Sequence, residues 1–198
     1  MGYFANNQNV KYMKKVKQPK KISVVVAVCA FNEEQNIEAF LKSVVNQKQS
    51  GFFLEEILVI SDGSTDLTAK KARSIKSKLL KVKEFKSRVG KSSRLNKIYS
   101  SLQSDILVQS DADIIFAHPY VIRDIIKPLI EDKQVGMCGG NPLPTKTITF
   151  TEKAINCSAD AYVQFRKKIR KGNNGFSADG RILAYKKSCL KKLLFQSI

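Results

Sequence analysis

ISVVVAV, residues 22–28, is a short run that is apolar apart from Ser23 and rich in β-branched side chains. Such runs form strands that are buried on both faces of a sheet. Directly downstream, Asn32 can cap a helix, Glu33 and Glu34 suit the positive end of that helix, and apolar residues then recur at helical spacing. We therefore predict a central strand, a tight loop and a helix that starts near Asn32.

The same strand-loop-helix unit recurs along the chain. Residues 56–60 (EILVI) read as a second strand, and Asp66 can cap the helix that follows. Residues 80–85 alternate apolar and charged side chains, as a strand near an edge does, and residues 105–109 (DILVQ) read as a fourth strand. Further elements are expected at 91–102 (helix), about 119–131 (helix), 135–139 (strand) and 151–170 (helix), and residues 181–198 form a short apolar-basic stretch. Alternating strands and helices predict an α/β fold with three layers and a mostly parallel sheet.

The chain is strongly basic. Its 198 residues include 35 Lys plus Arg against 17 Asp plus Glu, which gives a net charge of +18. Such a field attracts phosphorylated ligands, polyanions or an anionic membrane surface, although a solvated lysine-rich surface accounts for it equally well. Nucleic acid is not an expected partner, because neither aromatic platforms nor a recognition-helix motif accompany the charge.

The cysteines and the apolar segments of the chain indicate the cellular compartment in which it is expected. The four cysteines show no CxxC spacing, which indicates neither a zinc site nor a disulfide framework and fits a reducing compartment. Residues 1–21 form a basic polar leader without the apolar stretch of a signal peptide, and no apolar run approaches the roughly 20 residues that cross a bilayer. We expect a cytoplasmic chain. Its positive charge is also compatible with a location at the anionic inner face of the cell membrane.

Acidic side chains follow several of the predicted strands. Asp62 comes after the second strand, and Asp111-Ala112-Asp113 comes after the fourth. Open parallel sheets bind ligands at these strand ends. Two carboxylates that flank one residue can hold a divalent cation beside a diphosphate, although a surface turn with two solvated acids shows the same tripeptide.

Four motifs in a fixed order carry a resemblance to a known family. They read CAFNEE (29–34), SDGSTD (61–66), GKSSRLN (90–96) and SDILVQSDAD (104–113). The chain thereby resembles the family 2 glycosyltransferases, whose signatures read roughly PAYNEE, DDGSTD, GKxxALN and GDILVFLDAD. The resemblance covers residues 22–121 closely and 175–190 more loosely. It implies a GT-A fold over residues 22–198, with a nucleotide-binding half at about 22–140 and part of the acceptor side at about 141–198.

The resemblance also implies roles for residues that would contact the nucleotide. Ala30, Phe31 and Glu33 would cradle the base and ribose. Asp62 would accept a hydrogen bond from the ring N–H of the base, which suits uracil. Both expectations point to a UDP-sugar as the donor substrate.

The metal and phosphate contacts follow in the same way. Asp113 would coordinate a Mg²⁺ or Mn²⁺ that bridges the two phosphates, and Asp111 would lie near the ribose and the metal. Lys91, and with lower priority Arg94, would place positive charge toward the diphosphate. The only histidine, His118, receives no role.

The chain departs from the family where the catalytic base is expected. Inverting members place an Asp after the acceptor segment, yet residues 180–198 contain neither Asp nor Glu. Asp179 and Asp160 are the late carboxylates, and the family supports neither as a substitute. The expectation is a C-terminally truncated chain. Two hypotheses remain open: an inverting, metal-dependent transferase acting on a glycan or lipid-linked acceptor, and a nucleotide-sugar-binding or partner-binding domain without turnover.

Overall fold

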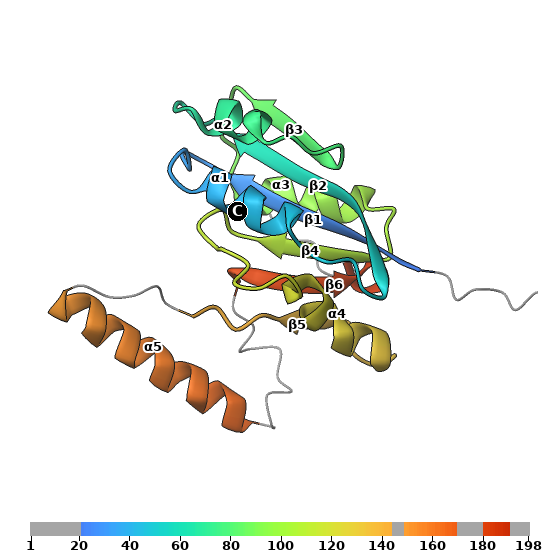
Figure 1. Ribbon diagram of the computed structural model, residues 1–198, viewed down its shortest axis with the longest axis vertical. Helices are drawn as coiled ribbons and strands as arrows, with labels where there is room; N and C mark the ends of the chain where they lie inside the picture. Colours follow the sequence, from blue (N-terminus) through green and yellow to red (C-terminus); the bar gives the residue numbers. More distant parts are fainter. Residues whose placement is uncertain (1–20, 144–148, 170–179, 191–198) are drawn as a thin grey trace, which may run out of the picture.

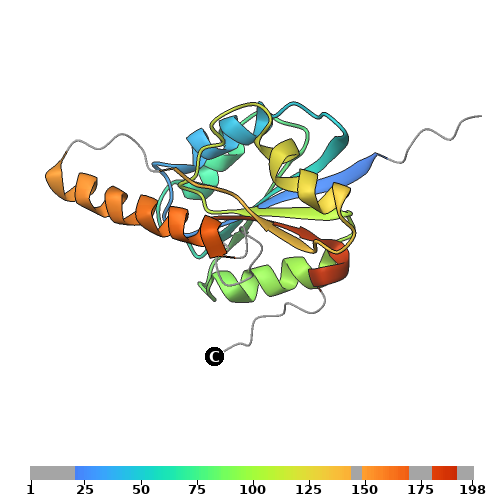
Figure 2. The ribbon, with the colours of Figure 1, turned by 90° about the horizontal axis from the view of Figure 1, so that it is seen from below.

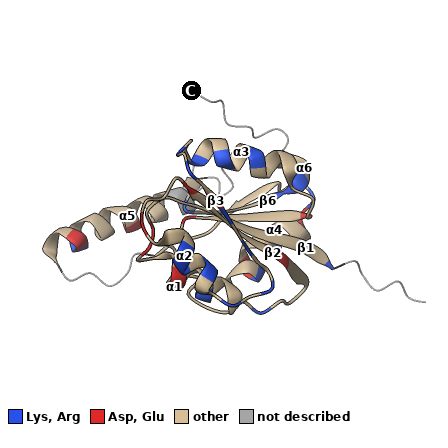
Figure 3. Ribbon diagram, turned by 90° about the horizontal axis from the view of Figure 1, so that it is seen from above, with Lys and Arg blue, Asp and Glu red and all other residues tan. Residues whose placement is uncertain are grey.

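A computed structural model describes residues 21–143, 149–169 and 180–190, including the whole sheet (Figure 1). Almost all of the basic leader and the candidate base Asp179 lie outside the described residues. Within those ranges, no helix combines the length and the apolar character needed to cross a bilayer. Lys and Arg are spread over several elements, among them the helices Thr68–Ser74 (α2), Lys91–Ser101 (α3) and Lys187–Leu190 (α6) (Figure 3).

The core of the fold is one sheet of six strands in the order β3-β2-β1-β4-β6-β5. The strands span Ile22–Ala30 (β1), Phe52–Asp62 (β2), Leu80–Phe85 (β3), Ile106–Ser110 (β4), Met137–Gly139 (β5) and Ile182–Lys186 (β6). β1 pairs in parallel with β2 and β4, β2 pairs in parallel with β3, and β6 runs antiparallel to both of its neighbours. The predicted mostly parallel sheet is confirmed.

Helices cover both faces of the sheet. They span Ile37–Val45 (α1), Thr68–Ser74 (α2), Lys91–Ser101 (α3), Val121–Glu131 (α4), Phe150–Lys168 (α5) and Lys187–Leu190 (α6). Apolar residues of α1, α2 and α4 pack in the core on one face, whereas those of α3 and α6 pack on the other. Figure 2 shows these layers, with α5 standing outside them. The predicted three-layer α/β architecture is confirmed.

β1 is the central strand that its composition predicts. Val24, Val26 and Val28 join the core on one face, and Val25 and Ala27 join the core on the other. All five side chains are buried. Burial of both faces explains why residues 22–28 show an apolar run rather than the alternation of a half-exposed strand.

The start of the first helix differs from the prediction. α1 begins at Ile37, five residues after the predicted cap Asn32. Asn32 instead adopts a left-handed backbone conformation (φ 55°), and its Oδ1 accepts a hydrogen bond from the Thr65 N–H at 2.9 Å. An asparagine tolerates this conformation, so the residue shapes the loop after β1 instead of capping a helix.

β6 was not among the predicted elements. It inserts between β4 and β5, and its pairing with both is antiparallel. A regular alternation of strands and helices does not indicate such an insertion. The place of β6 depends on pairing with strands that are distant in the sequence. The Asp111 N–H donates to the Arg181 carbonyl at 2.9 Å, so the chain entering β6 is tied to the acidic motif after β4.

Hydrogen bonds join the loops that follow β1 and β2. The Glu33 N–H donates to Thr68 Oγ1 at 2.8 Å, and the Glu34 N–H donates to Asp66 Oδ2 at 3.0 Å. Asp66 Oδ1 also accepts from the Thr68 N–H at 2.9 Å, but the cap position of α2 is Leu67, so Asp66 shapes the turn before the helix instead of capping it as predicted. These bonds fix the carboxyl ends of neighbouring strands against each other.

Candidate functional site

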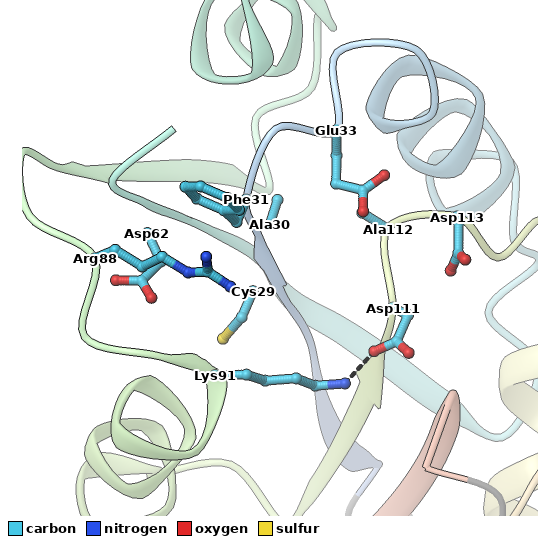
Figure 4. A pocket seen from close by; sticks show the side chains of 10 residues that line it. All are labelled: Cys29, Ala30, Phe31, Glu33, Asp62, Arg88, Lys91, Asp111, Ala112 and Asp113. Atoms are coloured by element: carbon cyan, nitrogen blue, oxygen red, sulfur yellow. Dashed lines mark hydrogen bonds and ion pairs between the residues drawn. The ribbon is translucent and has the colours of Figure 1, made fainter. Parts of the chain in front are cut away.

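A cavity of about 270 Å³ opens at the carboxyl ends of the parallel strands β1, β2 and β4 (Figure 4). It is lined by Cys29, Ala30, Phe31, Glu33, Asp62, Arg88, Lys91, Asp111, Ala112 and Asp113. Seven of the eight nucleotide- and metal-site residues proposed from the sequence therefore lie around one pocket, although they come from four separate segments, and Arg94 is the exception. The position agrees with the general rule that open α/β sheets bind ligands beyond their carboxyl strand ends.

The acidic motif forms one wall of the pocket. Asp111 and Asp113 follow β4 on the same side of the cavity, and the Lys91 ammonium forms an ion pair with Asp111 Oδ1 (Figure 4). The Asp111 side chain is 30% exposed and that of Lys91 is 41% exposed, so both groups can reach a ligand. The cavity therefore brings two carboxylates of the acidic motif together with one ammonium group from α3.

These two carboxylates suit a divalent cation that takes its other ligands from a substrate. Among the described residues, no group of three or more His, Cys, Asp or Glu side chains forms a complete metal cage. Mg²⁺ is commonly bound through one or two carboxylates together with substrate phosphates and water. Asp111 and Asp113 fit this pattern, with hard oxygen ligands beside a cavity that is open to solvent.

Asp62 lies at the floor of the pocket, where its side chain is almost fully buried. Its carboxylate accepts hydrogen bonds from the backbone N–H groups of Val89 (3.1 Å) and Gly90 (2.8 Å) and from Arg94 Nε (2.7 Å). Burial alone would raise the pKa of Asp62, but the bonds from Arg94, Val89 and Gly90 outweigh it and lower the pKa below the ordinary value. Asp62 is therefore ionised at neutral pH.

The structure places Arg94 differently from the sequence-based expectation. Its side chain is buried on α3 behind the pocket and does not line the cavity. The guanidinium pairs with Asp62 and lies 3.6 Å from the centroid of the Phe85 ring. Its charge is thus directed to a carboxylate of the protein rather than into the pocket.

Arg88 is a pocket residue that the sequence interpretation missed. Its guanidinium lies 3.9 Å from the centroid of the Phe31 ring, and both side chains line the cavity (Figure 4). The family signatures did not include this position. The available signal was its place two residues before Gly90-Lys91, in the loop between β3 and α3.

The depressed pKa of Asp62 makes stability depend on pH. A carboxyl with a lowered folded-state pKa contributes stability above its unfolded-state pKa of about 3.9, and this contribution is lost as the pH falls through the folded-state value. Asp62→Asn leaves Arg94 buried without its counter-charge, so we expect a loss of about 3 kcal/mol at pH 7. Urea unfolding should show a smaller difference between variant and wild type at pH 3. An equal difference at both pH values, or an equal effect of the exposed control Asp124→Asn, would contradict this assignment.

A family model described as Glycosyl transferase family 2 matches residues 25–194. An uncharacterized glycosyltransferase of Haemophilus influenzae is 34% identical over 118 residues, which cover 59% of this chain and 35% of that protein. The glucosyl-3-phosphoglycerate synthase of Petrotoga mobilis is 29% identical over 136 residues, which cover 65% of this chain and 41% of that protein. The chain thus spans less than half the length of these relatives.

Solved structures share the fold. A mannosyltransferase from Pyrobaculum calidifontis, in complex with GDP-Man and Mn²⁺, superposes with a TM-score of 0.69 at 24% identity and covers 87% of this chain and 47% of its own. Glucosyl-3-phosphoglycerate synthase from Mycobacterium tuberculosis, in complex with Mn²⁺, UDP-Glc and phosphoglyceric acid, gives 0.56 at 20% identity and covers 84% and 57%. Both likenesses establish the GT-A type of fold. Because the family model spans nearly the whole sequence, the chain belongs to glycosyl transferase family 2.

Proposed function

We propose that the pocket binds a nucleoside-diphosphate sugar with a divalent cation, and that the protein transfers the sugar to an acceptor hydroxyl. The observation that carries this proposal is the meeting of Asp111, Asp113 and Lys91 beside Phe31 and Asp62 in one pocket at the strand ends. The first three match the charges of a metal-bound diphosphate, and the last two offer a ring face and a fixed acceptor for a base.

The side chains would share the work of binding and of stabilising the leaving group. Asp111 and Asp113 would hold Mg²⁺ or Mn²⁺, and Lys91 would place its ammonium near the diphosphate. When bound, such an ion neutralises charge that develops on the departing nucleotide. Phe31 and Glu33 would orient the base and ribose, which keeps the anomeric carbon open to in-line attack and inversion.

The donor base and the acceptor are the finer parts of the proposal. We propose a UDP-sugar because Asp62 keeps an ionised carboxylate at the floor of the pocket that can accept the ring N–H of uracil. The solved relatives contain either UDP-Glc or GDP-Man, so GDP-sugars are the direct competitors. A glycan or lipid-linked sugar is the proposed acceptor class, whereas one solved relative contains phosphoglyceric acid.

A turnover assay tests the proposal. The protein is incubated with UDP-glucose, UDP-N-acetylglucosamine or GDP-mannose in Mn²⁺, and free nucleotide is followed by liquid chromatography with and without candidate acceptors. Release of nucleotide from one donor, lost in EDTA, is the expected result. Binding of a donor without release would favour the second candidate, a nucleotide-sugar-binding domain. That candidate draws support from Asp160, which is exposed on α5 and does not line the pocket.

The positive charge supports a further part of the proposal, contact with an anionic membrane surface at the inner face of the cell membrane. Each Lys or Arg near such a surface contributes about 1 kcal/mol. We expect co-sedimentation with vesicles that contain phosphatidylglycerol and none with pure phosphatidylcholine. Raising the salt from 0.1 M to 0.5 M should release the protein, because the attraction between exposed charges is screened. Equal binding to both vesicle types, or none to either, would contradict membrane contact through charge.

A further inference from the structure

A buried ion pair lies directly behind the pocket. The Arg94 and Asp62 side chains are 3% and 4% exposed, and Arg94 Nε donates to Asp62 Oδ1 at 2.7 Å. Taking two charges out of water costs much of what their attraction returns, so such a pair adds little net stability. The role of the pair is therefore expected to lie in the backbone segments that it fixes.

The pair holds the loop between β3 and α3. Arg94 Nη2 donates to the Ser87 carbonyl at 2.9 Å, and the N–H groups of Val89 and Gly90 donate to the Asp62 carboxylate. At the start of the loop, the Arg94 guanidinium stacks on Phe85. Contacts with the pair therefore occur along the whole segment from β3 to the first turn of α3.

The two cations that line the pocket lie on this loop, Arg88, and directly after it, Lys91 at the start of α3. Arg88 stands between the Ser87 carbonyl and the Val89 amide that the pair fixes, and its guanidinium covers Phe31. Lys91 follows the fixed Gly90 directly, and its ammonium meets Asp111 across the cavity. The positions of both side chains depend on backbone that is hydrogen-bonded to Asp62 and Arg94.

The residue type at position 94 is a departure from the family signature. The motif that reads GKxxALN in the family reads GKSSRLN here, so a long cation stands where the signature has alanine. An alanine could neither pair with Asp62 nor reach Ser87. The contacts of Arg94 are thus a property of this chain that the signature does not supply.

We infer that Arg94 is a positioning residue: paired with Asp62, it fixes the loop of residues 87–90 and thereby sets Arg88 and Lys91 at the pocket that receives the nucleoside diphosphate. The inference rests on the proposed function for its ligand. Arg94 itself touches neither the cavity nor the acidic motif, so its effect on the ligand passes through the loop.

Amide hydrogen exchange tests the loop without any ligand. In Arg94→Lys the charge is kept, but one ammonium cannot donate in the fixed fork to both Asp62 and Ser87 while stacking on Phe85. We expect the amides of Val89 and Gly90 to exchange at least about 10-fold faster, and the amides of β1 to stay unchanged. The matched control is Arg123→Lys on α4, because Arg123 also pairs with a carboxylate (Asp124, 2.7 Å) and lies over a ring (Tyr120, 4.3 Å).

A double-mutant cycle tests the link to the ligand. Calorimetry with UDP and with GDP in Mn²⁺ should show roughly 10-fold weaker binding for Arg94→Lys. In a Lys91→Ala background, Arg94→Lys should reduce the nucleotide affinity clearly less, because the Lys91 ammonium that the loop positions is already absent. A general loss of structure would instead weaken both backgrounds equally.

The outcomes are separable. Unchanged exchange at Val89 and Gly90 in a folded Arg94→Lys variant overturns the inference, as do fully additive effects in the cycle. If the wild type binds neither UDP nor GDP, the proposed function fails, and the exchange measurement alone decides the role of Arg94 in the loop. If Arg94→Lys does not fold, Arg94→Gln, which keeps an N–H donor toward Asp62, replaces it under the same criteria.

Discussion

Asp113→Ala is expected to weaken the binding of a nucleoside diphosphate in Mn²⁺ roughly 100-fold, which corresponds to about 2.8 kcal/mol. The acidic motif offers only two carboxylates, and the described part of the chain shows no third His, Cys, Asp or Glu beside them that completes a metal cage. Losing one of two protein ligands leaves too few hard oxygens to hold the cation against water. Calorimetric titration of UDP or GDP into variant and wild type measures the difference.

The control for this substitution is Glu131→Ala. Glu131 is an exposed acid on α4 that pairs loosely with Lys127 (3.8 Å) and does not line the pocket, so the same loss of one negative charge occurs away from the site. Its nucleotide affinity should match the wild type. In EDTA, Asp113→Ala and the wild type should bind equally weakly. A wild-type affinity for Asp113→Ala in Mn²⁺ would remove Asp113 from the metal site.

Gly63→Ala is expected to destabilise the protein by about 2 to 5 kcal/mol and to weaken nucleotide binding as well. Gly63 has a left-handed backbone (φ 73°), and an added Cβ would lie 2.5 Å from the Arg88 backbone nitrogen. The left-handed conformation alone costs a non-glycine residue about 1 to 2 kcal/mol, and forcing atoms into a packed region adds about 1 to 3 kcal/mol. Arg88 directly precedes Val89 and Gly90, whose N–H groups donate to Asp62, so a shift of the Arg88 backbone is expected to strain those bonds.

Gly51→Ala separates the two costs. Gly51 also has a left-handed backbone (φ 82°), but a Cβ there meets no atom within 4 Å. We expect urea unfolding to show a loss of about 1 to 2 kcal/mol for Gly51→Ala, a larger loss for Gly63→Ala, and weaker UDP or GDP binding for Gly63→Ala alone. Equal losses would mean that the loop accommodates the Cβ, and that its position matters less than the contacts indicate.

The pattern of apolar and polar side chains along the sequence predicted those strands whose burial depends on their own residues. The apolar run at residues 22–28 indicated a central strand, because a strand buried on both faces carries consecutive apolar side chains, and residues 24–28 are divided between the cores on the two faces. The alternation at residues 80–85 indicated an edge strand, and β3 lies at the edge. β6 escaped prediction because only its distant partners β4 and β5 give it its place and direction.

The residues of the pocket likewise divide into those that a sequence motif identifies and those whose positions depend on tertiary contacts. Asp62, Asp111 and Lys91 were found because they stand within ordered motifs at strand ends, and parallel pairing brings those ends together. Arg88 and Arg94 were missed or misplaced because their positions depend on tertiary contacts. Arg88 stacks on the ring of Phe31 in the loop after β1, and Arg94 pairs with the carboxylate of Asp62 at the end of β2. Spacing within a motif does not reveal which of several cations faces the cavity.

The most direct test of the central claim, a metal-dependent nucleoside-diphosphate site at the strand ends, is one calorimetric comparison. UDP and GDP are titrated into the wild-type protein in Mn²⁺ and again in EDTA. The expected result is binding of one nucleotide in Mn²⁺, UDP by our proposal, with an affinity that falls at least about 10-fold in EDTA. Binding of neither nucleotide, or binding that EDTA leaves unchanged, would contradict the role assigned to Asp111 and Asp113.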